Sequence, residues 1–399
     1  MMQGIRWAMM ICLVLLHTTT QAGLAEGLAA YANKDYSNAR KEFTPLAKQG
    51  NAVAQFKLGI LYANGLGVAA NEKLAIAWYR KAATQGYAAA QYSLGWMYAN
   101  GHGVAQDNQQ ALAWYHKAAA QGYARAQSDL GTLYVTGRGT QRDPAQALLW
   151  YQRAAAQHHA PAQYNLGMMY ETGIGVTRDD KQAATWYHKA ADQGEAAAQR
   201  KLGLMYLHGR GVSKDQQQAM AWLRKAATQG DAIAEYEMGL AYRDGGPVPR
   251  DIKQAIVWYR KAAGQGYVQA QTSLGLIYSL GWWGVAKDQQ KAANWYRLAA
   301  SQGDPSAQAQ LGLMYAAGDG VPRNVVVAYA LVSLAVSAED AHLRKIDTLS
   351  QKHLADAMSP QQIASAQNLS LDMAKPGNLL PALDHYLAKL TSTAASKPK

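Results

Sequence analysis

Few residues of this 399-residue chain combine the types and the spacing that covalent catalysis requires. A serine nucleophile with a lysine base needs Ser-x-x-Lys, which places the two side chains one helical turn apart. The chain contains that spacing once, at Ser396 and Lys399, in a terminal stretch with no scaffold around it. We therefore expect the match to be accidental and the protein not to be an enzyme.

Metal and thiol chemistry are also poorly represented. His158 and His159 are adjacent, but no carboxylate or further histidine stands at ligand spacing from them. The single cysteine, Cys12, lies in the extreme N-terminal segment, which excludes both a disulfide framework and a cysteine-based zinc site. The sequence thus predicts no metal and no cofactor.

The residue types that do occur at useful spacing are those that bind other macromolecules. Aromatic and arginine side chains are the usual anchors of protein interfaces. Helical offsets of three and four place nine candidates on one stripe, namely Phe56, Tyr92, Trp96, Tyr164, Met168, Arg200, His208, Tyr236 and Arg243. We predict a binding face there and leave one alternative open, in which the tyrosines only cover the seam between neighbouring units.

A second candidate is a turn that holds two adjacent tryptophans, Trp282 and Trp283, between two glycines. Two neighbouring indoles in a turn are hard to bury together, so one of them could project as an anchor. The alternative is that both fold back over the neighbouring turns.

These candidates belong to a pattern that returns every 36 residues. Each copy reads approximately A-x-x-x-L-G-x-x-Y, then a glycine-rich turn, then A-x-x-W-Y-x-K-A-A-x-Q-G. Its Leu-Gly pair (Met-Gly in one copy) begins at residues 58, 94, 130, 166, 202, 238, 274 and, after one inserted residue, 311. A fixed period of this size marks a solenoid, in which each unit buries its apolar face against its neighbours.

Each unit is predicted to be a pair of helices. In the first copy one helix ends at about Asn64, and Gly59 in its middle is expected to let the second helix approach closely, which offsets its low helix propensity. Asn71 is the expected N-cap of the second helix. The equivalent residues are all good N-caps: Asp107, Asp143, Asp179, Asp215, Asp251, Asp288 and Asn324.

The second helix carries a tryptophan at one fixed position and a basic residue three places later. The tryptophans, which we expect to be core residues rather than a ligand ladder, are Trp78, Trp114, Trp150, Trp186, Trp222, Trp258 and Trp295. The basic ladder is Lys81, Lys117, Arg153, Lys189, Lys225 and Lys261. We expect it to be a solvated face whose stems cover apolar surface. With a formal net charge of +12, the alternative is an envelope polymer binder that holds peptidoglycan, acidic glycan or another anionic envelope surface. Nucleic acid is not expected, since no groove-reading motif occurs.

The repeated positions resemble the Sel1-like repeat family, a relative of the tetratricopeptide repeats. The resemblance implies an all-α, right-handed α-solenoid of about eight 36-residue helix-turn-helix repeats over residues 51–340, after an N-terminal half repeat or cap at 23–50. Residues 341–375 resemble the helical cap of bacterial members, with Ser359 capping and Pro360 starting the last helix, and 376–399 would be a partly disordered tail. Members are mostly adaptors, and the chain is similar to the secretory immunoglobulin A-binding member, whose partner does not carry over. Cysteine-rich relatives have been classed as β-lactam hydrolases, but this chain lacks their cysteine pairs.

The N-terminal segment, 1–22, is predicted to be a signal peptide. A positive start is followed by an apolar run from Trp7 to Leu16, and Ala22 is a small residue suited to cleavage before Gly23. The run is too short to span a bilayer, which takes about 20 apolar residues. We expect a periplasmic or secreted protein with no transmembrane segment in the mature chain, the alternative being a retained N-terminal anchor.

One turn departs from the pattern. Units end in Gln-Gly, but the third ends in Gln157 and His158. The closing position usually takes the left-handed conformation, which glycine enters freely and histidine only at a cost. We therefore predict a weak joint between the third and fourth units.

Together these features predict an exported, non-catalytic scaffold that binds a protein or peptide on the concave face of the solenoid. The partner would be a host or an envelope factor. Envelope polymer binding is the first alternative and β-lactam hydrolysis the least favoured one.

Overall fold

The structure is a computed structural model that describes residues 22–246, 248–336 and 341–395, without the side chains of residues 283, 341–347 and 393–395. Every regular element in those residues is a helix. Chain contacts divide the molecule into two compact units, Met1–Ala198 with Arg210–Ser213, and Gln199–Gly209 with Lys214–Lys399. The expected signal peptide lies outside the described residues except for its last position.

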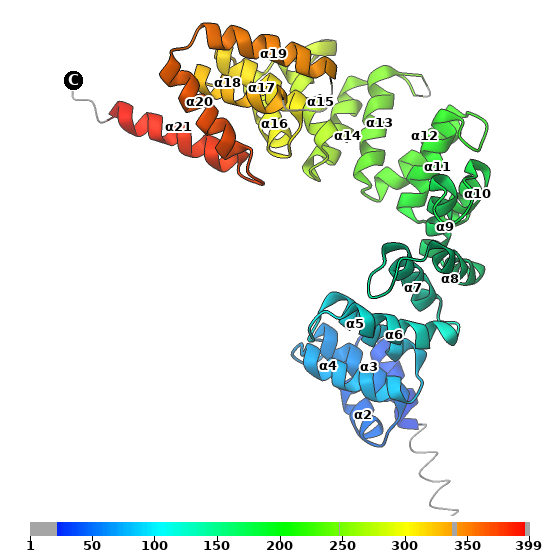
Figure 1. The fold of residues 1–399 in the computed structure, drawn as a ribbon. Coiled ribbons are helices and arrows are strands. Elements are labelled where there is room, and N and C mark those ends of the chain that lie inside the picture. Colours follow the sequence, from blue (N-terminus) through cyan, green and yellow to red (C-terminus); the bar gives the residue numbers. More distant parts are fainter. Residues whose placement is uncertain (1–21, 247, 337–340, 396–399) are drawn as a thin grey trace, which may run out of the picture. The chain divides into compact units, whose positions relative to one another are not determined.

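Eight helix pairs account for most of the described chain (Figure 1). In the first unit the pairs are α3 (Ala52–Asn64) with α4 (Glu72–Thr84), α5 (Ala88–Asn100) with α6 (Asn108–Ala120), α7 (Ala124–Thr136) with α8 (Pro144–Ala156), and α9 (Ala160–Thr172) with α10 (Asp180–Asp192). Next come α11 (Ala196–His208), which spans the boundary of the units, and α12 (Gln216–Thr228). The second unit continues with α13 (Ala232–Asp244) and α14 (Ile252–Gly264), α15 (Val268–Leu280) and α16 (Gln289–Ser301), and α17 (Pro305–Ala317) and α18 (Val325–Val336), with a short 3₁₀ turn η1 (Trp282–Gly284).

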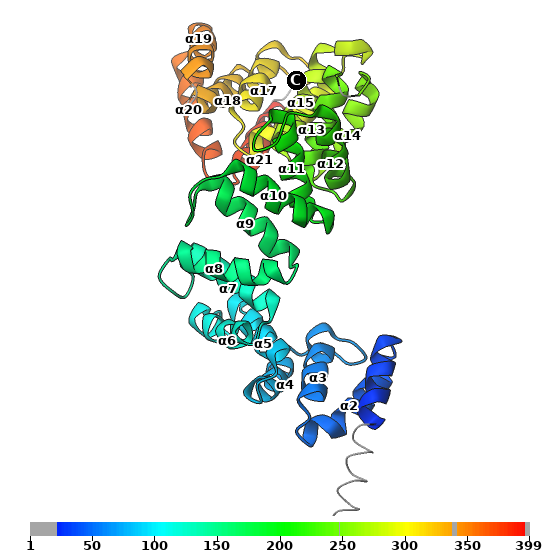
Figure 2. The same cartoon turned by 90° about the vertical axis from the view of Figure 1, so that its right-hand side faces the viewer.

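Within each unit the second helix of one pair packs against the first helix of the next, so that α4 contacts α5 and α14 contacts α15 (Figure 2). This succession confirms the predicted all-α solenoid of helix-turn-helix repeats.

The helix ends follow the predicted residue types. The side chain of Asn71 accepts a hydrogen bond from the backbone N–H of Leu74 at 2.9 Å, and aspartates cap α6, α8, α10, α12, α14 and α16 in the same way. Gly65 ends α3 in the left-handed conformation, with φ of 66°. These caps bind backbone groups that the helices leave without partners.

The mid-helix glycine lets the second helix approach closely, as predicted, and in six repeats the nearest group is a tyrosine ring of that helix. A Cβ atom on Gly59 would stand 2.4 Å from the ring of Tyr79, and one on Gly167 would stand 2.5 Å from the ring of Tyr187. No real Cβ atom tolerates such a contact. In six repeats the first helix therefore provides a socket for the tyrosine of its own second helix, whereas Gly203 faces Leu223 and Gly312 faces Val332.

The tryptophans are less buried than a core position requires. Trp150 and Trp222 are 8% and 7% exposed, whereas the other tryptophans at this position are only half-buried. The following residue is the more regular core position. It is a tyrosine in six of the seven repeats, with Tyr187 and Tyr259 both 0% exposed, and Leu223 in the other. The indole N–H of Trp150 is buried without a hydrogen-bond partner in the described residues.

The basic ladder belongs to this scaffold. In six repeats the cation three residues after the tryptophan lies over its indole ring, at distances from 3.9 Å for Lys225 over Trp222 to 4.5 Å for Lys81 over Trp78. Such cation–π contacts are attractive because the face of the ring is electron-rich. The lysines thus cover apolar surface, as the sequence predicted.

A buried row of glutamines ties each repeat to the one before. In the first repeat Gln55 donates to the carbonyl of Ala47 at 3.0 Å, and Gln85 donates to the side-chain oxygen of Gln55 at 2.7 Å. The amide pair recurs at 91 with 121, 127 with 157, 163 with 193, 199 with 229 and 271 with 302. In the sixth repeat Glu235 takes the buried position and accepts from Gln265 at 2.7 Å.

The N-terminal segment contains two helices, where the sequence suggested a half repeat. Helical residues 22–32 precede α2 (Tyr36–Lys48). Phe43, 0% exposed, takes the place of the core tyrosine, and a Cβ atom on Gly27 would stand 2.6 Å from its ring. The segment is therefore a shortened first pair that covers the start of the repeats.

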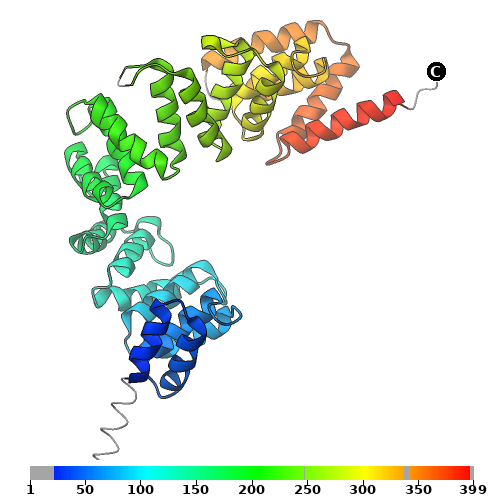
Figure 3. The ribbon, with the colours of Figure 1, turned by 180° about the vertical axis from the view of Figure 1, so that it is seen from behind.

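Three helices cover the end of the array (Figure 3): α19 (Ala341–Asp356), α20 (Pro360–Met373) and α21 (Leu379–Ala395). As predicted, Ser359 and Gln362 form a capping box and Pro360 starts α20. Where the sequence suggested a partly disordered tail, the structure has α21, because Leu379 and Leu383 are 5% and 0% exposed in the core cluster of the last repeats.

The turn after the third repeat has the predicted geometry. His158 has φ of 59°, and its backbone N–H donates to the carbonyl of Ala155 at 3.0 Å. The glycines that close the other repeats have φ between 84° and 99°. His158 is therefore held in a left-handed conformation that L-residues adopt at a cost.

Candidate functional site

A surface whose residues differ from repeat to repeat runs along the first helices, and we call it the first-helix face. It consists of the side chains at residues 56, 60, 63 and 64 of α3 and at the equivalent positions of the later first helices. The sockets, the glutamine row and the indole–cation pairs use other positions. Nine of the predicted binding residues lie on this face.

The predicted aromatic residues at the 56-equivalent position lie at the seams between repeats. The ring of Tyr92 lies 5.2 Å from that of Tyr123, which begins the next repeat, and 5.6 Å from that of Tyr115. Phe56 and Tyr236 contact the two equivalent rings, one in the second helix of the same repeat and one at the start of the next repeat. All three residues are half-buried.

At two later seams the 56-equivalent residue forms a polar pair instead of an aromatic contact. Arg200 forms a 2.9 Å ion pair with Asp231, and both side chains are 15% exposed. Thr272 is hydrogen-bonded to Asp304 at 3.2 Å. The 56-equivalent residue therefore contacts the first residue of the next repeat. This is the alternative given above, in which these residues cover the seam between neighbouring units.

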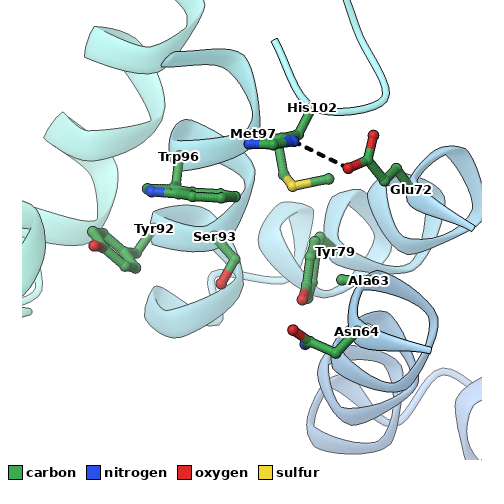
Figure 4. Close-up of a pocket in the computed structure, with 9 residues that line it drawn as sticks. All are labelled: Ala63, Asn64, Glu72, Tyr79, Tyr92, Ser93, Trp96, Met97 and His102. Carbon is green, nitrogen blue, oxygen red and sulfur yellow. Dashed lines mark hydrogen bonds and ion pairs between the residues drawn. The ribbon is translucent and has the colours of Figure 1, made fainter. Parts of the chain in front are cut away.

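Trp96 differs from these residues because it stands over a cavity. Its side chain is 42% exposed. A pocket of about 430 Å³, here called the Trp96 pocket, is lined by Ala63, Asn64, Glu72, Tyr79, Tyr92, Ser93, Trp96, Met97 and His102. Figure 4 shows the rings of Trp96, Tyr92 and Tyr79 arranged around Ser93. Two predicted residues, Tyr92 and Trp96, are thus brought together.

The indole of Trp96 is held by a chain of contacts. The imidazole of His102 stacks on it, with ring centroids 4.8 Å apart and planes at 7°. The Oε1 atom of Glu72, which is the first residue of α4, lies 3.0 Å from Nδ1 of His102 (Figure 4). Because its ring is already oriented, Trp96 would lose little freedom on binding.

The two tyrosines of the pocket are neutral hydrogen-bonding groups. Burial raises the pKa of the Tyr79 hydroxyl. Burial also raises the pKa of Tyr92, and the carboxylate of Asp129 adds to the effect. Both hydroxyls therefore keep their protons well above neutral pH.

The remaining predicted residues are dispersed. Tyr164 lies 5.7 Å from Tyr187, ring to ring. Met168 is half-buried, and His208 is exposed. Arg243 is paired with Asp244 at 2.6 Å. None of these lines the Trp96 pocket.

The turn at η1 exposes an indole. Trp282 is 43% exposed, whereas the side chain of Trp283 lies outside the described part. Three leucines on the first-helix face of α15 and α17 are also exposed: Leu276 by 38%, Leu280 by 45% and Leu313 by 42%. The second unit therefore presents an apolar first-helix face.

Sequence reasoning missed Glu72 and His102. Neither belongs to the first helix, where the binding stripe was sought. A signal existed in the repeat itself, because the equivalent residues three repeats later are Asp180 and Arg210, which carry opposite charges. Opposite charges at these two positions indicate that the start of α4 and the turn after α5 lie together.

In the part of the chain that the structure describes, no group of three or more His, Cys, Asp or Glu side chains could hold a metal ion. No described helix is long and apolar enough to cross a membrane.

Comparisons with known proteins identify the repeat. The Sel1 repeat family model matches residues 52–87, 88–123, 124–159, 160–195, 196–231, 232–267, 268–304 and 305–340. Among solved structures, the chain is similar to a protective antigen of uropathogenic Escherichia coli strains with an SLR fold (29% identity, 95% of both chains, TM-score 0.61). It is also similar to a Sel1 repeat protein from Oxalobacter formigenes (36% identity, 76% of this chain and 88% of the other, TM-score 0.59). Comparison with curated proteins gives no match.

Proposed function

Because the chain belongs to the Sel1 repeat family, whose members are typically protein-interaction scaffolds, we propose that it is an exported, non-catalytic scaffold. It binds a protein or peptide partner on the first-helix face, which we expect to be the concave one. The partner is a host or an envelope factor.

The observation that carries the proposal is the contrast between fixed and variable surfaces. The tyrosines, tryptophans and lysines of the second helices are used in packing. The first-helix face instead holds an exposed, oriented indole at Trp96 beside a pocket, and exposed leucines at 276, 280 and 313. Exposed aromatic and apolar side chains of this kind are usual interface anchors.

The same contacts weaken the alternative of an envelope polymer binder. That alternative depended on the basic ladder, but the ladder cations lie over indole rings at 3.9–4.5 Å. They remain partly accessible, yet their spacing follows from the repeat and needs no polymer to explain it.

Export is supported by the sequence of the N-terminal segment, 1–22, and by the similarity to a bacterial protective antigen. The mature chain should begin at Gly23. N-terminal sequencing of the protein from the envelope and culture fractions tests this, and retention of Met1 there would contradict it.

The binding proposal is tested with the chain from residue 23 onward. Envelope extract and host secretions are each passed over the immobilised protein, and the recovered partner is used for hydrogen-exchange footprinting. We expect protection on α3, α5 and the other first helices.

The variant Trp96→Ala should reduce partner recovery at least tenfold. Leu149→Ala is the matched control, because Leu149 is 38% exposed on α8, a second helix. Protection confined to second helices, or retention of peptidoglycan in place of a protein, would refute the proposal.

A further inference from the structure

We propose that the Trp96 pocket takes a lysine or arginine side chain from the partner polypeptide. The inference rests on the proposed function and specifies the chemistry of one contact. It follows from the lining of the pocket, from an equivalent seam in the same chain and from the way this chain pairs its other indoles.

The lining favours a cation. Trp96, Tyr79 and Tyr92 surround the cavity (Figure 4), and the faces of such rings attract positive charge. Glu72 is the one carboxylate among the nine lining residues, and none of the nine is a lysine or arginine. Its side chain is 46% exposed, so it remains available beside His102.

A volume of about 430 Å³ lies near the lower end of the range for ligand sites, roughly 300–1,000 Å³. A cavity of this size suits one long side chain. Asn64 and Ser93 add polar groups that could orient the head group or the backbone that carries it.

At the seam between the fourth and fifth repeats a guanidinium stands at the position that His102 occupies at the first seam. Asp180 corresponds to Glu72 and Arg210 to His102, each three repeats later. There Nη2 of Arg210 lies 3.4 Å from Oδ1 of Asp180 and 3.4 Å from Oε1 of Glu171. The chain thus supplies an arginine to the later seam and an imidazole to the earlier one.

The indoles of the second helices give the same indication. In six repeats a cation of the chain covers the ring at 3.9–4.5 Å. In the described part of the chain, His102 stacks on the ring of Trp96, and no lysine or arginine lies over that ring. A cation from the partner would give Trp96 the cation–π contact that the second-helix tryptophans already make with cations of the chain.

The test uses small probes and the chain from residue 23 onward at pH 8. N-acetyl-L-arginine amide and N-acetyl-L-lysine amide are titrated against the protein, and the indole N–H signal of Trp96 is followed by NMR. Its assignment comes from the Trp96→Phe spectrum. N-acetyl-L-citrulline amide is the matched probe, since it has the shape of arginine without the charge.

We expect both cationic probes to shift the Trp96 signal at millimolar concentrations, with affinity about tenfold above that of the citrulline probe. Glu72→Gln should remove that preference. Trp96→Leu, which introduces the residue found at position 204, lacks the reporter indole, so probe binding to it is followed through the ring signals of His102 and should be lost. Asp192→Asn is the control, because Asp192 pairs with His188 at 2.9 Å on α10 and lines no part of the pocket.

Equal affinity for the arginine and citrulline probes would overturn the inference, as would an unchanged preference in Glu72→Gln. Tighter binding of N-acetylglucosamine than of either cation would point to a glycan and also overturn it. Failure of the probes together with a partner footprint on the first helices would refute this inference alone. Probe binding with a footprint on the second helices would refute the proposed function alone.

Discussion

The seams between repeats one and two and between repeats four and five use the same positions in different ways. Both keep a glycine socket filled by a tyrosine, Tyr79 in one and Tyr187 in the other. At the first seam Ala63 and His102 leave the Trp96 pocket beside Tyr79. At the later seam Glu171 and Arg210 stand at the equivalent positions.

At the later seam the added charges are satisfied within the chain. The hydroxyl of Tyr187 donates to Oε2 of Glu171 at 2.6 Å. Hydrogen bonds from Arg178 and Arg210 lower the pKa of Asp180. Both seams thus keep the socket and differ in the residues around it, which leave a pocket beside Tyr79 and form hydrogen bonds and ion pairs beside Tyr187.

The largest expected effect is on the feature that both seams share. Tyr79→Ala and Tyr187→Ala should each cost about 3–5 kcal/mol, because each removes a buried aromatic ring from a socket. Calorimetry of the purified variants measures this, with Leu149→Ala as an exposed control. A loss below about 1 kcal/mol at either seam would mean that the socket is not a stabilising element.

The two seams should differ in what the loss of the tyrosine hydroxyl costs. Tyr187→Phe should cost about 1–3 kcal/mol, because Glu171 loses a hydrogen bond at a largely buried carboxylate. Tyr79→Phe removes a hydroxyl that borders the pocket and should cost less than about 0.5 kcal/mol. Equal costs in thermal unfolding would show that the two seams do not differ as described.

A third prediction concerns Glu235, the carboxyl that replaces glutamine in the buried row. Burial raises the pKa of Glu235, while Gln265 and Lys261 act against the shift and Asp231 adds to it. A raised pKa in the folded state means that this carboxyl stabilises below its unfolded pKa and that the contribution is lost as pH rises through the folded value. Glu235→Gln should therefore stabilise the protein at pH 8 by about 1 kcal/mol and have little effect near pH 4.

The reverse substitution is the matched control. Gln163→Glu places a carboxyl at the regular position, where Gln163 now accepts from Gln193 at 2.7 Å and donates to the carbonyl of Ala155 at 3.3 Å. It should destabilise at pH 8 more than at pH 4. Chemical unfolding at both pH values measures the pair, and a pH-independent effect of Glu235→Gln would disprove the role given to this carboxyl.

The smallest effect is expected at the joint between repeats three and four. His158→Gly should raise stability by up to about 1 kcal/mol, because glycine enters the left-handed region freely. Gly194→His, at the equivalent position one repeat later, should lower it by a similar amount. A Cβ atom on Gly194 would have no neighbour within 4 Å, so the effect is conformational.

Hydrogen exchange gives a second measure of the same joint. Amides of residues 150–165 should exchange faster than those of the other junctions in the native protein, and His158→Gly should slow them. Equal protection at all junctions, with no stabilisation by the glycine, would rule out a weak joint.

Much of the fold could be predicted from residue types and spacing. The Leu-Gly repeat and the N-cap residues located the helix pairs, and Ser359 located the start of α20. The role of Gly59 was only half predicted, because its low helix propensity indicates a close contact without naming the ring of Tyr79. The helix α21 was missed, since its burial depends on the core of the last repeats rather than on a local pattern.

The candidate site was predicted only in part. Trp96 and Tyr92 were found because they are aromatic residues on one helical stripe. Glu72 and His102 were missed, because they belong to neighbouring repeats and meet only when those repeats stack. Tyr236 and Arg200 were chosen for their types, yet the structure places them against the next repeat, where Asp231 pairs with Arg200.

The sequence by itself determined the repeat, the helix ends and the left-handed turn at His158, because these depend on local periodicity and on the backbone preferences of single residues. Only the tertiary structure decided which side chains the packing of the repeats leaves exposed. That outcome depends on contacts between repeats: the tyrosine sockets, the cations over the indoles and the pairing of Glu72 with His102. Residues with the same local pattern are buried, half-covered or exposed according to what the neighbouring repeat places against them, and no local sequence pattern contains that information.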